Sequence, residues 1–169
     1  MDSINGFEAE AHGTVGRKVK LKLLSRIAYV DLVHEVAEAL ARDARFPKPE
    51  ALNIGLAVRE AFINAIKHGN RMDAAKRVEV EFQETADRFL VRIRDEGPGF
   101  DWNQTIDPLN AENIFRTSGR GIFFMKHFVD RVDFRRRRGR GTEVLLEKRI
   151  EPSAGRAGGG SQAMKRRRG

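Results

Sequence analysis

The sequence contains no cysteine and no long apolar segment. Without cysteine the chain can form neither a disulfide nor a thiolate metal site, and it has no cysteine nucleophile. The longest uninterrupted apolar run has four residues, whereas a membrane-spanning helix needs about 20. Residues 1–5 have neither the basic nor the apolar region of a signal peptide. These absences predict a soluble, cytoplasmic protein that has no membrane partner.

The 169 residues suit one compact domain, and the 40% that are hydrophobic suffice for a core. Lys and Arg number 32 against 24 Asp and Glu, and this excess is concentrated in residues 135–140 and 151–169. The composition predicts a flexible lead-in over residues 1–13, a domain over 14–150 and a disordered basic tail over 151–169. The basic segments suit docking to nucleic acid or to an acidic protein, and they equally suit a solvated turn and a solubilising tail.

Hydrophobic spacing predicts an α+β domain. Alternating patterns predict strands over residues 15–24, 77–84, 88–95, 132–136 and 142–148, and helical spacing predicts helices over 27–45, 50–67 and 121–130. Residues 96–120 are rich in Gly, Asp and Asn and are predicted to form an irregular lid. Paired strands with helices between them predict a two-layer α/β sandwich, with helices packed on one face of a mixed or antiparallel sheet.

Four polar residues share one stripe of the second predicted helix. On a helical wheel Asn53, Glu60, Asn64 and Lys67 fall within about 60° of one another, beside an apolar arc of roughly 200° that includes Leu52. Arg59 is the exception, because it falls inside the apolar arc. Glu60 and Asn64 lie one turn apart and can act on the same bound group. The solvent-facing side of an ordinary helix has the same pattern, so both interpretations remain open.

A carboxylate ends the predicted strand 88–95. The period of two places Asp95 on the apolar face, so the side chain points inward and needs a hydrogen-bond donor, such as an exocyclic amine. Gly97 and Gly99 follow it and let the backbone approach a flat ligand closely. An ordinary turn capped by an aspartate has the same residues.

A second glycine-rich segment, Ser118, Gly119, Arg120 and Gly121, precedes the predicted helix 121–130. The N–H groups at a helix start bind phosphate well, although a hinge would also explain the glycines. The sequence has no GxxxxGK[ST] loop and no complete GxGxxG motif. A nucleotide would therefore have to bind in another way.

Taken in order, residues 60–70, 95–100, 119–122 and 141–142 resemble the four ATP-site motifs of the Bergerat-fold superfamily. This superfamily includes gyrase, histidine kinases and mismatch-repair ATPases. The close spacing and the short lid are most similar to those of the anti-sigma-factor serine kinases of bacteria. The resemblance covers about residues 14–149 and implies a histidine-kinase-type ATPase fold that uses ATP and Mg²⁺.

The resemblance also implies a role for each site residue. Glu60 would be the base that accepts the proton of a partner's hydroxyl, Asn64 would offer an oxygen to Mg²⁺, and Asp95 would accept a hydrogen from the adenine amino group. The residues that would line the base pocket are Gly97, Gly99 and Thr142. Those that would hold the phosphates are Gly119, Arg120 and Gly121.

The implied function is that of an ATP-dependent anti-sigma factor with serine kinase activity. Such a protein, usually a homodimer, binds a sigma factor and phosphorylates an anti-anti-sigma protein. Two other functions remain open: an ATP-binding module of the same fold without phosphoryl transfer, and a basic nucleic-acid binder. The presence of both Glu60 and Asn64 argues against the first alternative. The lack of aromatic residues among the arginines of the tail argues against the second.

Overall fold

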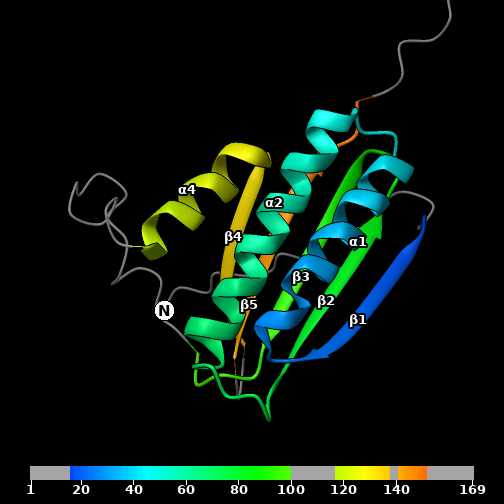
Figure 1. Ribbon diagram of the computed structural model, residues 1–169. Helices are drawn as coiled ribbons and strands as arrows, with labels where there is room; N and C mark the ends of the chain where they lie inside the picture. Colours follow the sequence, from blue (N-terminus) through cyan, green and yellow to red (C-terminus); the bar gives the residue numbers. More distant parts are fainter. Residues whose placement is uncertain (1–15, 100–116, 138–140, 152–169) are drawn as a thin grey trace, which may run out of the picture.

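The computed structural model in Figure 1 describes residues 16–99, 117–137 and 141–151, with the backbone alone for 117–120. The strands are β1 (Lys18–Leu24), β2 (Arg77–Glu84), β3 (Arg88–Asp95), β4 (Arg131–Arg136) and β5 (Thr142–Arg149), and the helices are α1 (Val30–Asp43), α2 (Lys48–Asn64) and α4 (Thr117–Phe128). A 3-10 turn, Ile27–Tyr29, precedes α1, and a π-helical turn, Ala65–Gly69, follows α2. The predicted lead-in, residues 100–116 of the predicted lid and residues 152–169 of the predicted tail lie outside the described residues.

The five strands form one sheet in the order β1-β2-β3-β5-β4, and every neighbouring pair is antiparallel. The three helices cover one face of this sheet (Figure 1), with α2 in the middle and packed against both α1 and α4. The predicted two-layer α/β sandwich is therefore confirmed. Of the two predicted kinds of sheet, mixed and antiparallel, the structure has the antiparallel one. None of the helices within the described ranges has the length and hydropathy that crossing a membrane requires.

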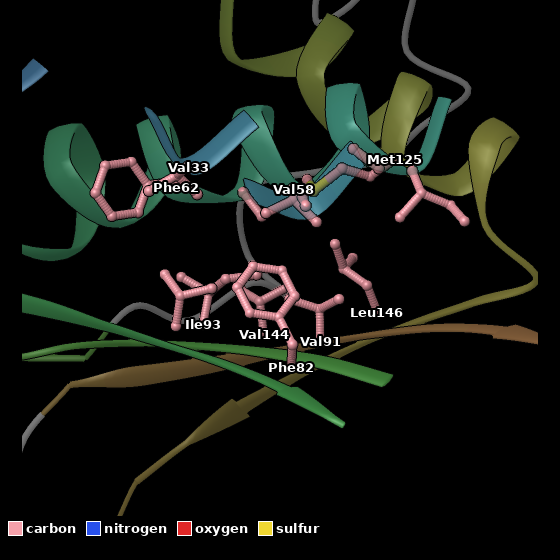
Figure 2. Close-up of a cluster of buried hydrophobic side chains, with 14 of the residues drawn as sticks. Val33, Val58, Phe62, Phe82, Val91, Ile93, Met125, Val144 and Leu146 are labelled. Atoms are coloured by element: carbon pink, nitrogen blue, oxygen red, sulfur yellow. The ribbon is translucent and has the colours of Figure 1, made fainter. Parts of the chain in front are cut away.

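The hydrophobic core fills the space between the helices and the sheet (Figure 2). On β3 the alternation expected from the sequence places Phe89, Val91 and Ile93 in this core, each at most 3% exposed. Val58 and Phe62 of α2 face them from the helical layer and are fully buried. Helix α2 is thus fixed along its length by apolar burial, which makes it a rigid support for polar side chains.

The described boundaries of α2 differ from the predicted range 50–67. The helix begins at Lys48 because Pro49 fits a first helical turn, where a backbone N–H would have no partner. It gives way after Asn64 to the π-helical turn. Leu52, predicted on the apolar arc, is 42% exposed. A helical wheel gives the direction of a side chain but not how far the neighbouring elements extend.

Other boundaries were also predicted wrongly. Helix α1 ends at Asp43 rather than Arg45, because Arg45 adopts a left-handed φ of 70°, the conformation that commonly ends a helix. Helix α4 begins at Thr117 rather than Gly121, so residues 117–120 are helical instead of irregular. Glycine costs about 1 kcal/mol in a helix, and the burial of Ile122 in the core offsets such a cost. Strand β1 starts at Lys18 in the described part of the predicted range 15–24.

The opposite face of the sheet carries charged side chains. Glu81 of β2 lies among Lys18, Lys20, Arg92 and Arg94, at 3.1 to 3.6 Å from their nitrogen atoms, and its side chain is only 6% exposed. Burial alone would raise the pKa of Glu81, but the hydrogen bond and the charges of these neighbours lower it. Ion pairs and long side-chain stems cover this face, where no described helix packs.

We expect Phe62→Ala to lower the free energy of unfolding by about 3–5 kcal/mol, because it opens a cavity where a fully buried ring packs. The matched variant Phe123→Ala removes a ring that is 67% exposed and should change stability by about 0.5 kcal/mol or less. Urea denaturation followed by circular dichroism measures both values. Equal losses in the two variants would contradict the described position of the core.

Candidate functional site

The predicted site residues gather at the C-terminal end of α2. The π-helical turn that follows this helix packs against β3, and the first turns of α4 lie against the helix itself. Most of the candidate residues form two groups. One surrounds Asp95 at the end of β3, and the other consists of Glu60, Asn64 and Gly121 between α2 and α4.

Asp95 is the last residue of β3 and is 3% exposed, as its position in the strand predicts. Its Oδ1 accepts hydrogen bonds from the backbone N–H groups of Gly97, at 2.9 Å, and Thr142, at 3.1 Å. Among the described residues no hydrogen bond reaches Oδ2. One carboxylate oxygen is therefore held by the protein, and the other can accept a hydrogen from a ligand.

Three glycines pack closely around Asp95. A Cβ atom at Gly69 would overlap the Asp95 carboxylate, one at Gly97 would overlap the carbonyl oxygen of Gly69, and one at Gly141 would overlap the carbonyl oxygen of Asp95. The sequence predicted that Gly97 lets a flat ligand approach. The structure gives a second reason why this position needs glycine, because the backbone of Gly69 lies directly against it. Gly69 and Gly141 were not predicted as site residues, although both lie within the motifs that carry the resemblance.

Gly99 has a φ of 83°, a left-handed conformation that favours glycine. A Cβ atom at this position would lie 2.8 Å from Nε of Arg136, which extends from the end of β4 across this segment. Nη2 of Arg136 also donates to the carbonyl oxygen of Pro98 at 3.5 Å. The arginine-rich turn between β4 and β5 thus begins beside the segment that follows Asp95.

Asn70, which the sequence did not single out, is fully buried behind the site. Its Nδ2 donates to the carbonyl oxygen of Arg77 at 2.9 Å, and its Oδ1 accepts the backbone N–H of Glu96 at 2.8 Å. The side chain therefore joins the end of the π-helical turn to the start of β2 and the end of β3. Its position directly after a glycine that ends a helix was the available signal.

Glu60 and Asn64 lie beneath the first turns of α4. A Cβ atom at Gly121 would lie 2.8 Å from Oε2 of Glu60 and 3.7 Å from Nδ2 of Asn64. The side chain of Glu60 is 29% exposed, and Asn64 is 7% exposed. The polar stripe is therefore not simply a solvent-facing side, because its central residues face another helix. Lys67, farther along the stripe, is exposed.

Two buried polar atoms of predicted site residues, Nδ2 of Asn64 and Oγ1 of Thr142, have no hydrogen-bond partner in the described part of the chain. Leaving such an atom without a partner costs about 1–3 kcal/mol. Ser25 and His34 carry further atoms of this kind but were not predicted as site residues. Nδ2 of Asn64 is thus a donor that a ligand can use. The hydroxyl of Thr142 lies beside the Asp95 carboxylate and helps to lower its pKa.

Gly119 and Arg120, predicted to hold phosphates, lie in the first turn of α4. The first four N–H groups of a helix, counted from the residue before its first helical one, have no partner within it, and in α4 they include those of residues 117–119. The unpaired amides therefore lie about one turn before those that a helix starting at Gly121 would present.

Burial raises the pKa of Asp95, while the N–H groups of Gly97 and Thr142 and the charge of Arg137 act in the opposite direction. The folded protein consequently binds a proton at this carboxylate more readily than the unfolded chain does. Between the usual pKa of an aspartate and the raised pKa of Asp95, the unfolded chain loses this proton before the folded protein does. The free energy of unfolding should therefore fall as pH rises through this interval.

We expect the free energy of unfolding of Asp95→Asn, relative to wild type, to increase over this pH interval, because the variant has no titrating group there. Urea denaturation between about pH 3 and 7 measures the difference. Asp130→Asn is the control of opposite sign. Burial alone would raise the pKa of Asp130, but the Arg149 N–H and Lys148 lower it. Wild type should therefore be more stable than Asp130→Asn above the usual aspartate pKa, and this difference in the free energy of unfolding should shrink as pH falls. If the difference in free energy of unfolding between Asp95→Asn and wild type does not change with pH, the raised pKa of Asp95 is contradicted.

Comparison with known proteins agrees with this geometry. The family model of the histidine kinase-like ATPase domain matches residues 23–148, which include all four motif segments. The anti-sigma F factor of Clostridium beijerinckii is 35% identical over 105 residues, covering 60% of this chain and 72% of that protein. The serine-protein kinase RsbW of Listeria innocua is 27% identical over 150 residues, covering 83% and 96%. The RsbW kinase of Bacillus subtilis is 25% identical over 120 residues, covering 68% and 75%. The chain belongs to the anti-sigma-factor kinase family within the histidine kinase-like ATPases.

Proposed function

We propose that this protein is an ATP-dependent serine kinase and anti-sigma factor, which binds a sigma factor and phosphorylates an anti-anti-sigma protein on Ser or Thr. The observation that carries the proposal is the placement of two differently exposed carboxylates, Asp95 at the end of β3 and Glu60 on α2. Asp95, buried beside the end of α2, suits recognition of a base, whereas Glu60, partly exposed beneath α4, suits proton transfer.

Asp95 would select adenine. Its Oδ2, which has no donor among the described residues, can accept a hydrogen from the exocyclic amine. Guanine would bring a carbonyl oxygen toward the same carboxylate, and two acceptors cannot form a hydrogen bond. Thr142, whose buried hydroxyl lies beside the same carboxylate, would line the same pocket, together with Gly97 and Gly99.

The phosphates would bind at the start of α4. The free amides of its first turn and the positive end of the helix dipole favour anions, and Gly119, Arg120 and Gly121 lie in this part of the helix. Asn64 would give its carboxamide oxygen to Mg²⁺. Its side chain is available for this because it is buried beneath α4 and Nδ2 has no hydrogen-bond partner among the described residues. When bound, Mg²⁺ supplies positive charge that neutralises the phosphate oxygens.

Glu60 would act as the general base. The hydroxyl oxygen of the acceptor attacks the γ-phosphorus of ATP and forms a P–O bond, while the bond from that phosphorus to the bridging oxygen breaks and ADP leaves. The hydroxyl proton passes to the Glu60 carboxylate. Oε2 of Glu60 suits this step because it lies against the backbone of α4 at Gly121, beside the proposed phosphate site.

The names of the relatives support a sigma factor as one partner, since one is named an anti-sigma F factor and others are named serine-protein kinases. We propose in addition that an anti-anti-sigma protein is the phosphoacceptor and that the protein is a homodimer. No aromatic side chain lies among the arginines of the β4–β5 turn to stack on bases, so nucleic acid is not proposed as a partner.

We expect wild type to bind ATP and ADP with Mg²⁺ and to bind GTP at least tenfold more weakly, because the carboxylate opposes the guanine oxygen. Isothermal titration calorimetry measures the affinities. Asp95→Asn should lose the preference for adenine, whereas Asp130→Asn should keep it. Equal affinities of wild type for ATP and GTP would argue against the role of Asp95.

We expect wild type to transfer phosphate from ATP to at least one of the anti-anti-sigma proteins of the same organism, purified and tested as a panel with radiolabelled ATP. Glu60→Gln should lower the transfer rate by about 10²–10⁴-fold, the usual contribution of a general base. Glu50→Gln, a change at an exposed position of the same helix, should leave the rate unchanged. ATP binding without transfer to any protein of the panel would favour an ATP-binding module that does not catalyse.

A further inference from the structure

Arg59 precedes the proposed base on α2 and has no role in the function described so far. It is the residue that breaks the apolar arc of this helix, and its side chain is 38% exposed. We infer that Arg59 is a positioning residue, which holds the Glu60 carboxylate so that Oε2 remains turned toward the start of α4. This inference rests on the proposed kinase function.

The two oxygens of Glu60 have different neighbours. Nη1 of Arg59 donates to Oε1 at 3.5 Å. Oε2 lies on the other side, where a Cβ atom at Gly121 would be 2.8 Å away. The carboxylate is therefore placed between a cation of its own helix and the backbone of α4. Rotation of the Glu60 side chain would break the contact with Arg59.

This contact is not what helix geometry alone provides. Adjacent residues on a helix point about 100° apart, so their side chains do not normally face each other. The long side chain of Arg59 instead extends between two anions, Glu60 and Asp31 of α1, whose Oδ1 lies 3.8 Å from Nε of Arg59. The Asp31 carboxylate thus lies beside the guanidinium on the neighbouring helix, while Nη1 lies 3.5 Å from Oε1 of Glu60.

Stability does not account for the arrangement. Asp31 is 86% exposed and the Arg59 side chain is more than one-third exposed, and ion pairs between solvent-exposed groups contribute little to folding. Holding a catalytic carboxylate in one orientation has a larger effect, because a displacement of about 1 Å can slow a reaction by about a hundredfold. Loss of Arg59 should therefore affect the transfer rate far more than the fold.

The test measures single-turnover phosphoryl transfer from radiolabelled ATP to the anti-anti-sigma protein that wild type phosphorylates. Arg59→Gln should lower the rate by about ten- to hundredfold and leave the affinity for ATP, measured by calorimetry, within about twofold of wild type. Arg59→Lys keeps the charge and should recover most of the rate. Arg42→Gln removes a similarly exposed arginine that pairs with Glu38 on α1, and it should change nothing.

A double variant identifies the route of the effect. If Arg59 acts through Glu60, Arg59→Gln in the Glu60→Gln background should slow transfer no further, because the oriented group is already gone. The inference is overturned if Arg59→Gln transfers phosphate as fast as Arg42→Gln does. It is also overturned if the two losses multiply, which would mean that Arg59 contacts the reacting groups directly. Absence of transfer by wild type itself would overturn the proposed function and this inference with it.

Discussion

The close approach of the π-helical turn that follows α2 to the end of β3 is the constraint on which the site depends. Gly69 lies directly against the Asp95 carboxylate, and Gly97 lies directly against Gly69, so each position tolerates no side chain. The Thr142 N–H joins β5 to the same carboxylate. A single buried acid therefore fixes three segments that are distant in sequence, and its hydrogen bonds determine which of its oxygens remains available.

Helix α2 arranges the proposed site residues in order along its length. Its apolar residues anchor it between α1 and α4 over the sheet, and its polar stripe continues from Glu60 to Asn64 toward the π-helical turn. Base recognition is proposed beyond the end of the helix, and phosphoryl transfer one to two turns earlier. π-Helical turns often occur at functional sites, and here one carries the chain from Asn64 to Gly69.

Much of this arrangement could be predicted from periodicity, because alternation and helical spacing report which face of an element is buried. The strand pattern of residues 88–95 correctly placed Asp95 in the interior. Periodicity does not report which element lies opposite. The sequence therefore left open whether Glu60 and Asn64 face solvent, and the packing of Gly121 against them decides the question. The start of α4 was predicted too late because glycine is a poor helix former, and burial of its next residues outweighs that preference.

The two outer strands of the sheet have a further consequence. β1 carries Lys18, Lys20 and Lys22 on one face, and β4 begins with Arg131 and ends with Arg136. An outer strand exposes backbone groups to which a strand of another molecule can pair, and lysine or arginine side chains there oppose such pairing. Two copies that paired along β1 would have to accommodate two rows of lysines, of which Lys18 and Lys20 already pair with glutamates of β2. The basic residues of the outer strands thus oppose edge-to-edge pairing of the described sheet.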